Sequence, residues 1–305
     1  MRADAITRDC LTYLKQNRGR YLRVHSVFQR AINLVDDNNQ LLAILDNTKD
    51  QGAISLQLDF DTTISAILPG DLAEITNVGL EFLRGGPVID IKGIKPDNLT
   101  IQMRRLCTDP VEMVDRYNKL RRFIIEEGSM DGLAPLIDQS LPQNNYCNFV
   151  ADNLSDLVSW MEQNQVKKFR NGLSGVLGFG PGLTPSTDDF LTGLMLVAFV
   201  LRKDHPNPIF DVLLKDLPKI ALGKTTLISE EMIRLAAQGK TSNSYKSFVT
   251  GFFGRNPGNV RQLAKQVIKT GASSGTDFLY GIYASQTMVI NLLGGKNAES
   301  SSQKE

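Results

Sequence analysis

The sequence Gly178-Phe-Gly-Pro-Gly-Leu-Thr-Pro-Ser-Thr-Asp-Asp189 leads directly into an apolar stretch, Phe190-Leu-Thr-Gly-Leu-Met-Leu-Val-Ala-Phe-Val-Leu201. The glycines and prolines predict an unusual backbone path, because glycine reaches positive φ and proline fixes φ at about −65°. The apolar stretch is too short to cross a bilayer and predicts a buried helix. A glycine-rich loop at a helix N-terminus offers free backbone N–H groups and the positive end of the helix dipole. We therefore expect a phosphate or a carboxylate to bind there.

Helix capping is a purely structural interpretation of the same residues. Ser186 and Asp189 have the spacing of a capping box, in which the serine caps the helix and the acid reaches back to it. Thr184 followed by Pro185 is an alternative N-cap with proline at the first helical position. Capping explains neither Asp188 nor the glycines, so both interpretations stay open at this point.

A second copy of the motif lies near the C-terminus. Ser274-Gly-Thr-Asp-Phe-Leu-Tyr-Gly-Ile282 aligns without gaps with Ser186-Thr-Asp-Asp-Phe-Leu-Thr-Gly-Leu194. The alignment places Gly193 and Gly281 at equivalent helical positions, where a glycine costs about 0.5–1 kcal/mol relative to alanine. Their recurrence indicates the close approach of another backbone or of a ligand. We predict two helices that begin side by side, with their polar ends forming one pocket.

Composition limits the class of protein. The chain has 305 residues, 42% hydrophobic content and a net charge of +1, which suits one large or two modest domains and argues against a general nucleic-acid binder. Three cysteines without a CxxC pattern indicate reduced thiols. Two histidines exclude a His-rich metal centre, and we expect neither a metal nor a cofactor. Without a signal-like N-terminus or a long apolar run, we expect a cytoplasmic, soluble protein that does not enter a membrane.

Charge is unevenly distributed along the chain. Residues Thr108–Gln163 contain 10 acidic and 4 basic residues, a net charge of −6. Residues Lys224–Lys269 contain 8 basic and 2 acidic residues, a net charge of +6. These segments are either ordinary solvated helix faces or, for the basic one, an electrostatic attraction for an anionic substrate.

The order of patterns predicts an α+β fold, with a small N-terminal β-barrel or sandwich followed by a larger, mostly α-helical domain. We expect a β-rich domain with an N-terminal helix over 1–108, a helical domain over 109–295 and a disordered tail over 296–305. The predicted strands are 21–28, 30–35, 41–45, 53–58, 72–78 and 87–91. The predicted helices are 3–17, 110–127, 145–165, 166–175, 190–201, 209–222, 226–237, 245–251, 260–270 and 276–293.

Other polar residues are candidates for the pocket. His25 and Arg30 lie in or beside a predicted strand and either line a site or form an ordinary exposed edge. Gly223-Lys-Thr-Thr226 resembles the end of a P-loop, but Pro218 stands where that motif needs glycine. Thr225, Thr226 and Ser229 instead predict a helix cap with nearby hydroxyls, and Lys224 beside them is a candidate anion ligand.

With these residues in view, the sequence resembles the AllH subunit family of bacterial oxamate carbamoyltransferase. The resemblance rests on the motifs Val24-His-Ser-Val-Phe28, Gly178-Phe-Gly-Pro-Gly-Leu-Thr-Pro-Ser-Thr-Asp-Asp-Phe-Leu-Thr-Gly193, Thr225-Thr-x-x-Ser229 and Ser273-Ser-Gly-Thr-Asp277. It spans most of the chain. The family pattern usually has glycine at the position of Thr187, and we expect this departure to tighten the turn.

The resemblance implies the interconversion of oxalurate plus phosphate with oxamate plus carbamoyl phosphate in ureide and purine catabolism, in a multi-subunit complex with AllF-like and AllG-like partners. Because every reactant is an anion, the site needs amide donors and cations. The expected anion-binding residues are Gly180, Gly182, Thr184, Ser186, Ser273, Ser274, Thr225 and Ser229, with Lys224 or Arg30 as the countercharge. Asp188, Asp189, Asp277 and His25 are the catalytic candidates. The carboxylates are unfavourable beside an anion, so they either cap, orient donors, hold a cation or accept substrate amide N–H groups.

Three functions remain compatible with these patterns. The chain is either an enzyme subunit that forms much of a carbamoyl-transfer site, a non-catalytic assembly subunit, or a stand-alone enzyme that binds an amide or a nucleotide. The two polar helix starts and the basic segment favour the first of these.

Overall fold

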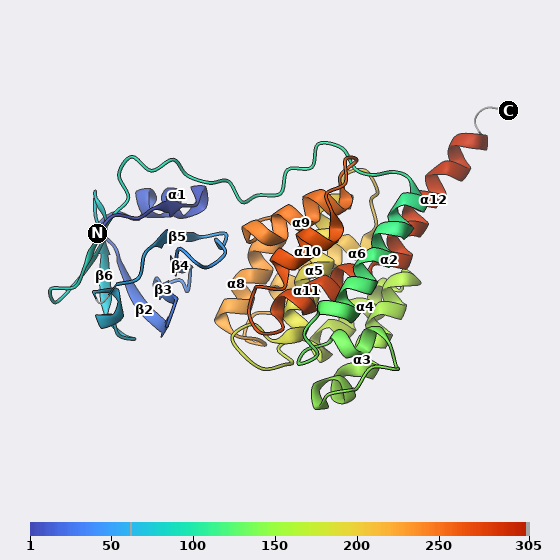
Figure 1. Ribbon diagram of the computed structural model, residues 1–305, viewed down its shortest axis with the longest axis horizontal. Coiled ribbons are helices and arrows are strands. Elements are labelled where there is room, and N and C mark those ends of the chain that lie inside the picture. Colours follow the sequence, from blue (N-terminus) through green and yellow to red (C-terminus); the bar gives the residue numbers. More distant parts are fainter. Residues whose placement is uncertain (62, 303–305) are drawn as a thin grey trace. The chain divides into compact units, whose positions relative to one another are not determined.

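The computed structural model describes residues 1–61 and 63–302. The chain forms two compact units, one of Met1–Thr100 with Thr241–Asn243 and one of Ile101–Lys240 with Ser244–Glu305. Each unit has its own cluster of buried hydrophobic side chains. Figure 1 shows strands in the first unit and helices in the second, which confirms the predicted α+β class. The first unit ends at Thr100, whereas the predicted boundary lies after residue 108.

The N-terminal unit is built on an eight-stranded sheet with the order β1-β5-β4-β3-β2-β6-β7-β8. Its strands are β1 (Ala5–Ile6), β2 (Tyr21–Phe28), β3 (Ala31–Val35), β4 (Leu41–Asp46), β5 (Ser55–Leu58), β6 (Leu72–Ile75), β7 (Gly79–Phe82) and β8 (Val88–Asp90). Exposure alternates along the first half of β2, so Leu22 and Val24 face the core while Tyr21 and Arg23 face solvent. Helix α1 (Arg8–Gln16) buries Cys10 and Leu14, and a short 3₁₀ helix, η1, spans Ile64–Ala66.

The first residues of the chain bond to both edges of this sheet. Arg2 forms a parallel bridge with Asp90, the last residue of β8, and the N–H of Ala3 donates to the carbonyl of Asp90 at 2.9 Å. A few residues later, β1 pairs antiparallel with β5 at the opposite edge. The sheet is therefore curled, and the N-terminal segment covers both of its edges, as expected of a small barrel-like β unit.

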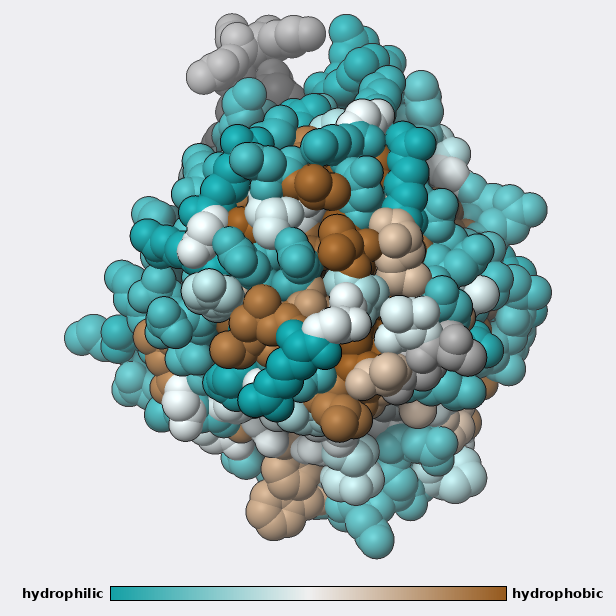
Figure 2. All heavy atoms as spheres, turned by 90° about the vertical axis from the view of Figure 1, so that its left-hand side faces the viewer, coloured by the Kyte–Doolittle hydropathy of each residue, from teal (hydrophilic) through white to brown (hydrophobic). Residues whose placement is uncertain are grey.

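Not all apolar side chains of this unit lie in its core. On the face shown in Figure 2, apolar side chains (brown) form several groups among hydrophilic ones (teal). Among the described residues of the unit, the large exposed apolar ones are Met1, Tyr21, Phe28, Leu68, Leu72, Leu83 and Val88. More than half of an ordinary protein surface is apolar, so these residues alone do not define a binding site.

The second unit consists of helices, many of which follow the predicted spans closely. They are α2 (Pro110–Glu127), η2 (Ala134–Ile137), α3 (Asn145–Glu162), α4 (Val166–Gly172), η3 (Leu173–Gly175), α5 (Ser186–Leu201), α6 (Pro208–Asp211), η4 (Val212–Asp216), α7 (Leu217–Ile220), α8 (Leu227–Ala236), α9 (Asn243–Phe253), α10 (Val260–Val267), α11 (Ser274–Ala284) and α12 (Gln286–Ser302). All but one residue of α5 are buried, and Figure 1 shows this helix with α11 in the interior of the unit.

Three predicted helices differ from the observed ones, and one strand was not predicted. The predicted first helix over 3–17 begins only at Arg8, because β1 precedes it, and a separate strand, β7, follows β6. The predicted helix over 209–222 is divided into α6, the π-helical η4 and α7, where Pro218 cannot donate a helical hydrogen bond. The predicted last helix ends at Ala284, because the hydroxyl of Ser285 donates to Ile282 O at 2.6 Å, and α12 begins after it.

The remaining predictions concern the cysteines, the tail and the membrane. Cys10, Cys107 and Cys147 are free and buried, in agreement with reduced thiols. The predicted tail overlaps α12 as far as Ser302, and 303–305 lie outside the described residues. Among the described residues, we find no helix with the length and apolarity needed to span a membrane.

Candidate functional site

The loop before α5 takes a path that requires glycine. Gly178, Gly180 and Gly182 have φ values of 73°, 126° and 92°. A Cβ at Gly180 would lie 2.5 Å from the backbone N of Ser186, and a Cβ at Gly178 would lie 2.5 Å from the carbonyl O of Lys224. Around Gly182 the space is open, so there only the backbone conformation favours glycine.

Two side chains from the first turn of α5 hold this loop. Oδ1 of Asp188 accepts the N–H of Gly178 at 2.8 Å. The hydroxyl of Thr187 accepts the N–H of Phe179 at 3.0 Å and donates to the carbonyl O of Phe179 at 2.9 Å. The side chain of Thr187 thus binds both backbone groups of Phe179, in agreement with the expectation that it tightens the turn.

The same loop presents backbone donors at the N-terminus of a long helix. Within the described part of the chain, no acceptor takes the backbone N–H groups of Gly180, Gly182, Leu183, Thr184 or Ser186. Of these residues, Gly182 and Leu183 are exposed. Free amides beside the positive end of α5 are the donors that an anion site requires.

Helices α5 and α11 begin side by side and are in backbone contact four residues after their aspartates. A Cβ at Gly193 would lie 2.4 Å from the carbonyl O of Phe278, and a Cβ at Gly281 would lie 2.0 Å from the carbonyl O of Phe190. Both glycines therefore serve the close approach of another backbone, as their recurrence in the sequence predicted.

The two polar helix starts meet as predicted. The hydroxyls of Thr184 and Ser274 lie 3.0 Å apart. Asp189 and Asp277 are almost fully buried and close enough for their charges to repel. The two motifs therefore bring two carboxyl groups together beneath the glycine-rich loop.

The surroundings of Asp277 include residues that sequence reasoning missed. The N–H of Leu133 donates to Oδ1 of Asp277 at 2.6 Å. A Cβ at Gly132 would lie 2.3 Å from the same oxygen, so only glycine leaves room for this carboxyl group. The thiol of Cys147 donates to the carbonyl O of Gly132 at 3.3 Å. Nothing in the sequence around Gly132 reveals a partner 145 positions away.

Burial raises the pKa of both carboxyl groups of the pair. Burial raises the pKa of Asp277 to about 6, although hydrogen bonds from Leu133, Ser186 and Ser273 oppose the rise. The pair is therefore partly protonated near neutral pH, since an ordinary aspartate has a pKa of about 3.9.

The shift of Asp189 is larger. Burial, followed by repulsion from Asp277, raises the pKa of Asp189 well above its usual value. The hydroxyls of Ser274 and Thr184 act in the opposite direction. A serine from the other motif thus lowers the pKa of each carboxyl group: Ser274 acts on Asp189, and Ser186 acts on Asp277.

One oxygen of each carboxyl group is unsatisfied. Oδ2 of Asp189 and Oδ2 of Asp277 are buried and have no hydrogen-bond partner among the residues that the structure describes. Buried acceptors of this kind are costly unless they share a proton or receive a donor from a ligand. The arrangement can therefore hold a proton or bind an N–H group. Among the described residues, no cluster of three or more His, Cys, Asp or Glu side chains is suited to a metal ion.

Asp188 has different partners from its neighbour Asp189. Besides Gly178, it accepts a hydrogen bond from the hydroxyl of Thr225. Burial raises the pKa of Asp188, and the hydrogen bonds from Thr225 and Gly178 oppose the rise. Its carboxylate therefore connects the loop before α5 to the start of α8.

The predicted cap of α8 is confirmed, and it places Lys224 nearby. The hydroxyl of Thr226 accepts the N–H of Ser229 at 3.1 Å, as an N-cap does. Lys224 is exposed, and its Nζ donates to the hydroxyl of Ser174 at 2.8 Å. Thr225 and Ser229 thus belong to the site around Asp188, and Lys224 lies at its solvent side.

Both capping interpretations of the central motif were wrong. The N-cap of α5 is Pro185, which has no side-chain capping bond, and Ser186 is the first helical residue. Ser273 precedes α11 without a side-chain capping bond either. Ser186 and Ser274 instead act on the carboxyl group of the other helix, which a single-helix motif could not reveal.

Two site predictions fall in the N-terminal unit. His25 is exposed, and its Nδ1 lies 3.2 Å from the hydroxyl of Ser26. Arg30 is exposed and donates to the hydroxyl of Thr48 at 3.3 Å. The roles of His25 and Arg30 in the site therefore stay predictions.

The acidic and basic segments partly neutralise each other. Arg261 forms ion pairs with Glu126, at 2.8 Å, and with Glu127. Lys265 pairs with Glu127 at 3.4 Å. These pairs support the interpretation that the charged residues of α2 and α10 form ordinary solvated helix faces. Other basic residues of the segment Lys224–Lys269 take no part in these pairs.

Comparison with known families assigns the chain. The family model described as oxamate carbamoyltransferase subunit AllH matches residues 176–286, which contain the loop and both aspartate motifs. The model described as the AllH family N-terminal domain matches residues 2–104, which contain the sheet. No solved structure matches the chain. Because the two models together cover most of the sequence, the chain belongs to the AllH family, the family of the oxamate carbamoyltransferase subunit AllH.

Proposed function

We propose that this chain is a cytoplasmic subunit of an oxamate carbamoyltransferase complex and that its glycine-rich loop and aspartate pair bind and react with the substrates. The reaction converts oxalurate and phosphate into oxamate and carbamoyl phosphate in ureide catabolism. The observation that carries this proposal is the pair of unsatisfied carboxyl oxygens on Asp189 and Asp277, adjacent to a loop with free backbone N–H groups.

The loop is suited to the anionic part of the substrates. The N–H groups of Gly180, Gly182 and Thr184 and the hydroxyls of Thr184 and Ser274 are donors for a phosphate or a carboxylate. Lys224 provides a positive charge at the solvent side. Preorganised donors of this kind stabilise the charge that develops during acyl transfer.

The aspartate pair is suited to the amide part. In the proposed reaction an oxygen of HPO₄²⁻ attacks the carbamoyl carbon of oxalurate, and the bond from this carbon to the nitrogen of oxamate breaks. The leaving nitrogen needs a proton, and the Asp189–Asp277 pair holds one because burial raises both pKa values. The proton of HPO₄²⁻ then restores the pair, so it is unchanged after a turnover.

Asp188 acts as a positioning residue in this scheme. Its carboxylate already accepts the N–H of Gly178 and the hydroxyl of Thr225, so it holds the loop without touching the substrate. This assigns Asp188 a role different from that of the two catalytic candidates, Asp189 and Asp277.

The proposal predicts phosphate-dependent oxalurate cleavage by the complex that contains this chain. We would assay carbamoyl phosphate formation with the isolated chain and with AllF-like and AllG-like partners. Asp189→Asn and Asp277→Asn should lower turnover of the assembled enzyme by about 100-fold or more, the usual effect of losing an acid–base group. Asp156→Asn, at an exposed position of α3, is the matched control and should leave turnover unchanged.

One observation favours the alternative of a non-catalytic assembly subunit. Asp189 and Asp277 are 1% and 0% exposed, so a substrate reaches them only if the loop moves away. Turnover that survives both Asp→Asn substitutions in a correctly assembled complex would establish the assembly role and end the catalytic proposal.

A further inference from the structure

Away from the aspartate pair, three arginines surround a surface depression of the helical unit. Arg104, Arg105 and Arg255 line a depression with a volume of about 670 Å³. The other polar side chains of its lining are Gln102, Thr250 and Asn256, which are neutral. A volume of this size is within the usual range for small-molecule sites, about 300–1,000 Å³.

The backbone that carries these arginines is firmly held. The N–H of Arg255 donates to the carbonyl O of Arg105 at 3.1 Å, and the N–H of Cys107 donates to that of Phe253 at 2.8 Å. Leu106 and Gly254 form an antiparallel bridge between these bonds. Arg105 and Arg255 are therefore fixed on adjacent, paired segments.

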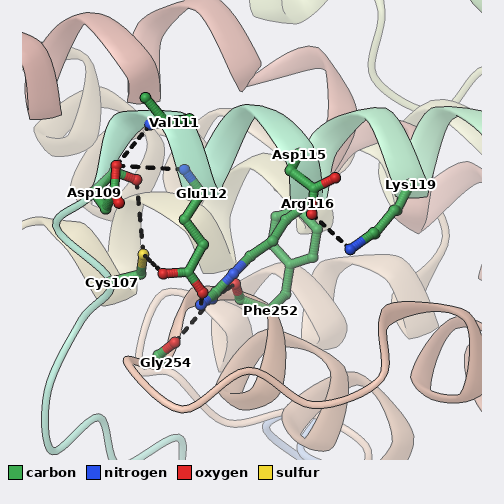
Figure 3. A network of polar contacts seen from close by, with 9 residues as sticks. All are labelled: Cys107, Asp109, Val111, Glu112, Asp115, Arg116, Lys119, Phe252 and Gly254. Atoms are coloured by element: carbon green, nitrogen blue, oxygen red, sulfur yellow. Dashed lines mark hydrogen bonds and ion pairs between the residues drawn. The ribbon is translucent and has the colours of Figure 1, made fainter.

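A buried arginine supports this pairing from inside the unit. Figure 3 shows Arg116 of α2 reaching the segment that precedes Arg255. Its Nη1 donates to the carbonyl O of Phe252 at 2.5 Å and to that of Gly254 at 2.8 Å. Its Nη2 pairs with Glu112 at 2.5 Å. Arg116 thus stabilises the segment before Arg255 through hydrogen bonds that do not involve Arg104, Arg105 or Arg255.

Arg104, Arg105 and Arg255 carry no ion pair within the described part of the chain, although they are exposed and close together. The same three residues also line a neighbouring depression of about 710 Å³, together with Asp109, Glu112 and Asp204. Of these acids, Asp109 caps α2 by accepting the N–H of Val111 at 2.9 Å, and Glu112 pairs with Arg116. Like charges held close together repel each other, so an anion bound between the three arginines would relieve this repulsion.

We propose that Arg104, Arg105 and Arg255 form a binding site for a small, multiply charged oxyanion such as a phosphate or a diphosphate group. The guanidinium group presents a planar set of donors that matches phosphate and carboxylate oxygens. The neutral amides and hydroxyl of Gln102, Thr250 and Asn256 suit the polar remainder of a ligand. This site uses no residue of the glycine-rich loop, so it is independent of the proposed function.

Calorimetric titration of the full chain with inorganic phosphate and with pyrophosphate at low ionic strength tests the site. The double variant Arg105→Gln/Arg255→Gln should weaken pyrophosphate binding at least tenfold, because it removes two groups that donate charge-assisted hydrogen bonds to the anion. The double control Arg122→Gln/Lys167→Gln, at exposed positions of α2 and α4 outside the depression, removes the same two charges and should keep the wild-type affinity.

A second control separates this site from the loop before α5. Gly180→Ala should disturb the loop, because its Cβ would lie 2.5 Å from Ser186 N, but should leave the arginine site unchanged. Equal weakening by Arg122→Gln/Lys167→Gln and by Arg105→Gln/Arg255→Gln would overturn the proposal, because net charge alone would then explain binding. The absence of pyrophosphate binding, with failed subunit assembly in the double variant, would also overturn it in favour of a protein-contact surface.

Discussion

Gly193 of α5 and Gly281 of α11 are in direct contact: a Cβ on Gly193 would lie 3.1 Å from the Cα of Gly281 and 2.4 Å from the carbonyl O of Phe278. The Gly281→Ala variant should therefore force the two helices apart. We expect it to lower the free energy of unfolding by at least about 1–3 kcal/mol, the usual cost of overpacking, because a backbone carbonyl cannot rotate away.

Urea unfolding would measure this effect against Gly294→Ala. Gly294 lies within α12 with no atom within 4 Å of its Cβ position, so alanine should stabilise that helix by about 0.5–1 kcal/mol. Equal stability changes in the two variants would contradict the close packing of α5 on α11.

Asp188 should tolerate asparagine but not alanine. Asparagine keeps an acceptor for the N–H of Gly178 and a polar group for Thr225, and it removes a buried charge whose pKa is raised mainly by burial. Alanine leaves both donors without an acceptor, which costs about 1–3 kcal/mol for each unsatisfied group. Thermal melting should place Asp188→Asn near the wild type and Asp188→Ala clearly below it. Equal melting temperatures for the two variants would show that Asp188 does not hold the loop.

Gly132→Ala should displace Asp277, although the change adds only a methyl group. That Cβ would lie 2.3 and 2.4 Å from the two carboxylate oxygens of Asp277. In the assembled enzyme we expect a turnover loss comparable to that of Asp277→Asn. Gly175→Ala, where the Cβ meets no atom within 4 Å, is the control and should keep full turnover. Full turnover in the Gly132→Ala variant would mean that the position of Asp277 does not matter for the reaction.

The sequence was most informative where a residue pattern had a single physical explanation. The recurrence of Gly193 and Gly281 in two aligned motifs predicted the backbone contact between two helices. Strong apolar periodicity predicted α2 to the residue, over Pro110–Glu127. The α+β order of the units followed from the same patterns.

The partners of the polar residues were not predictable from local patterns. Ser186 and Asp189 have the spacing of a capping box, yet each acts across the interface with α11. Gly132 and Leu133, which surround Asp277, are distant in sequence and carry no motif. Local spacing describes one helix, whereas this site depends on how two helices and two loops pack together.

The buried pair predicts a characteristic pH dependence of stability. A carboxyl group whose pKa is raised in the folded state binds its proton more tightly there than in the unfolded chain. Its contribution to stability is therefore fully present below the unfolded pKa of 3.8 and is lost as the pH rises through about 6, in the case of Asp277. Asp189, whose pKa is raised further, extends the loss to higher pH.

Asp277→Asn should remove the part of this dependence that is due to Asp277, because asparagine does not titrate, and it should reduce the part due to Asp189, because asparagine no longer repels that carboxylate. A shift of about two pKa units corresponds to about 3 kcal/mol, so the variant should gain about this much stability relative to the wild type between pH 4 and pH 8. The quantity to compare is how the difference in unfolding free energy between the variant and the wild type changes with pH. The loss of the hydrogen bond from Leu133 lowers the stability of the variant by the same amount at every pH, so it does not affect this change. Urea unfolding at each pH would measure it, with Asp156→Asn as the exposed control that should follow the wild-type curve. Parallel curves for the wild type and Asp277→Asn would mean that Asp277 is ionised in the folded protein throughout this range, and the pair would then hold no proton for a leaving group.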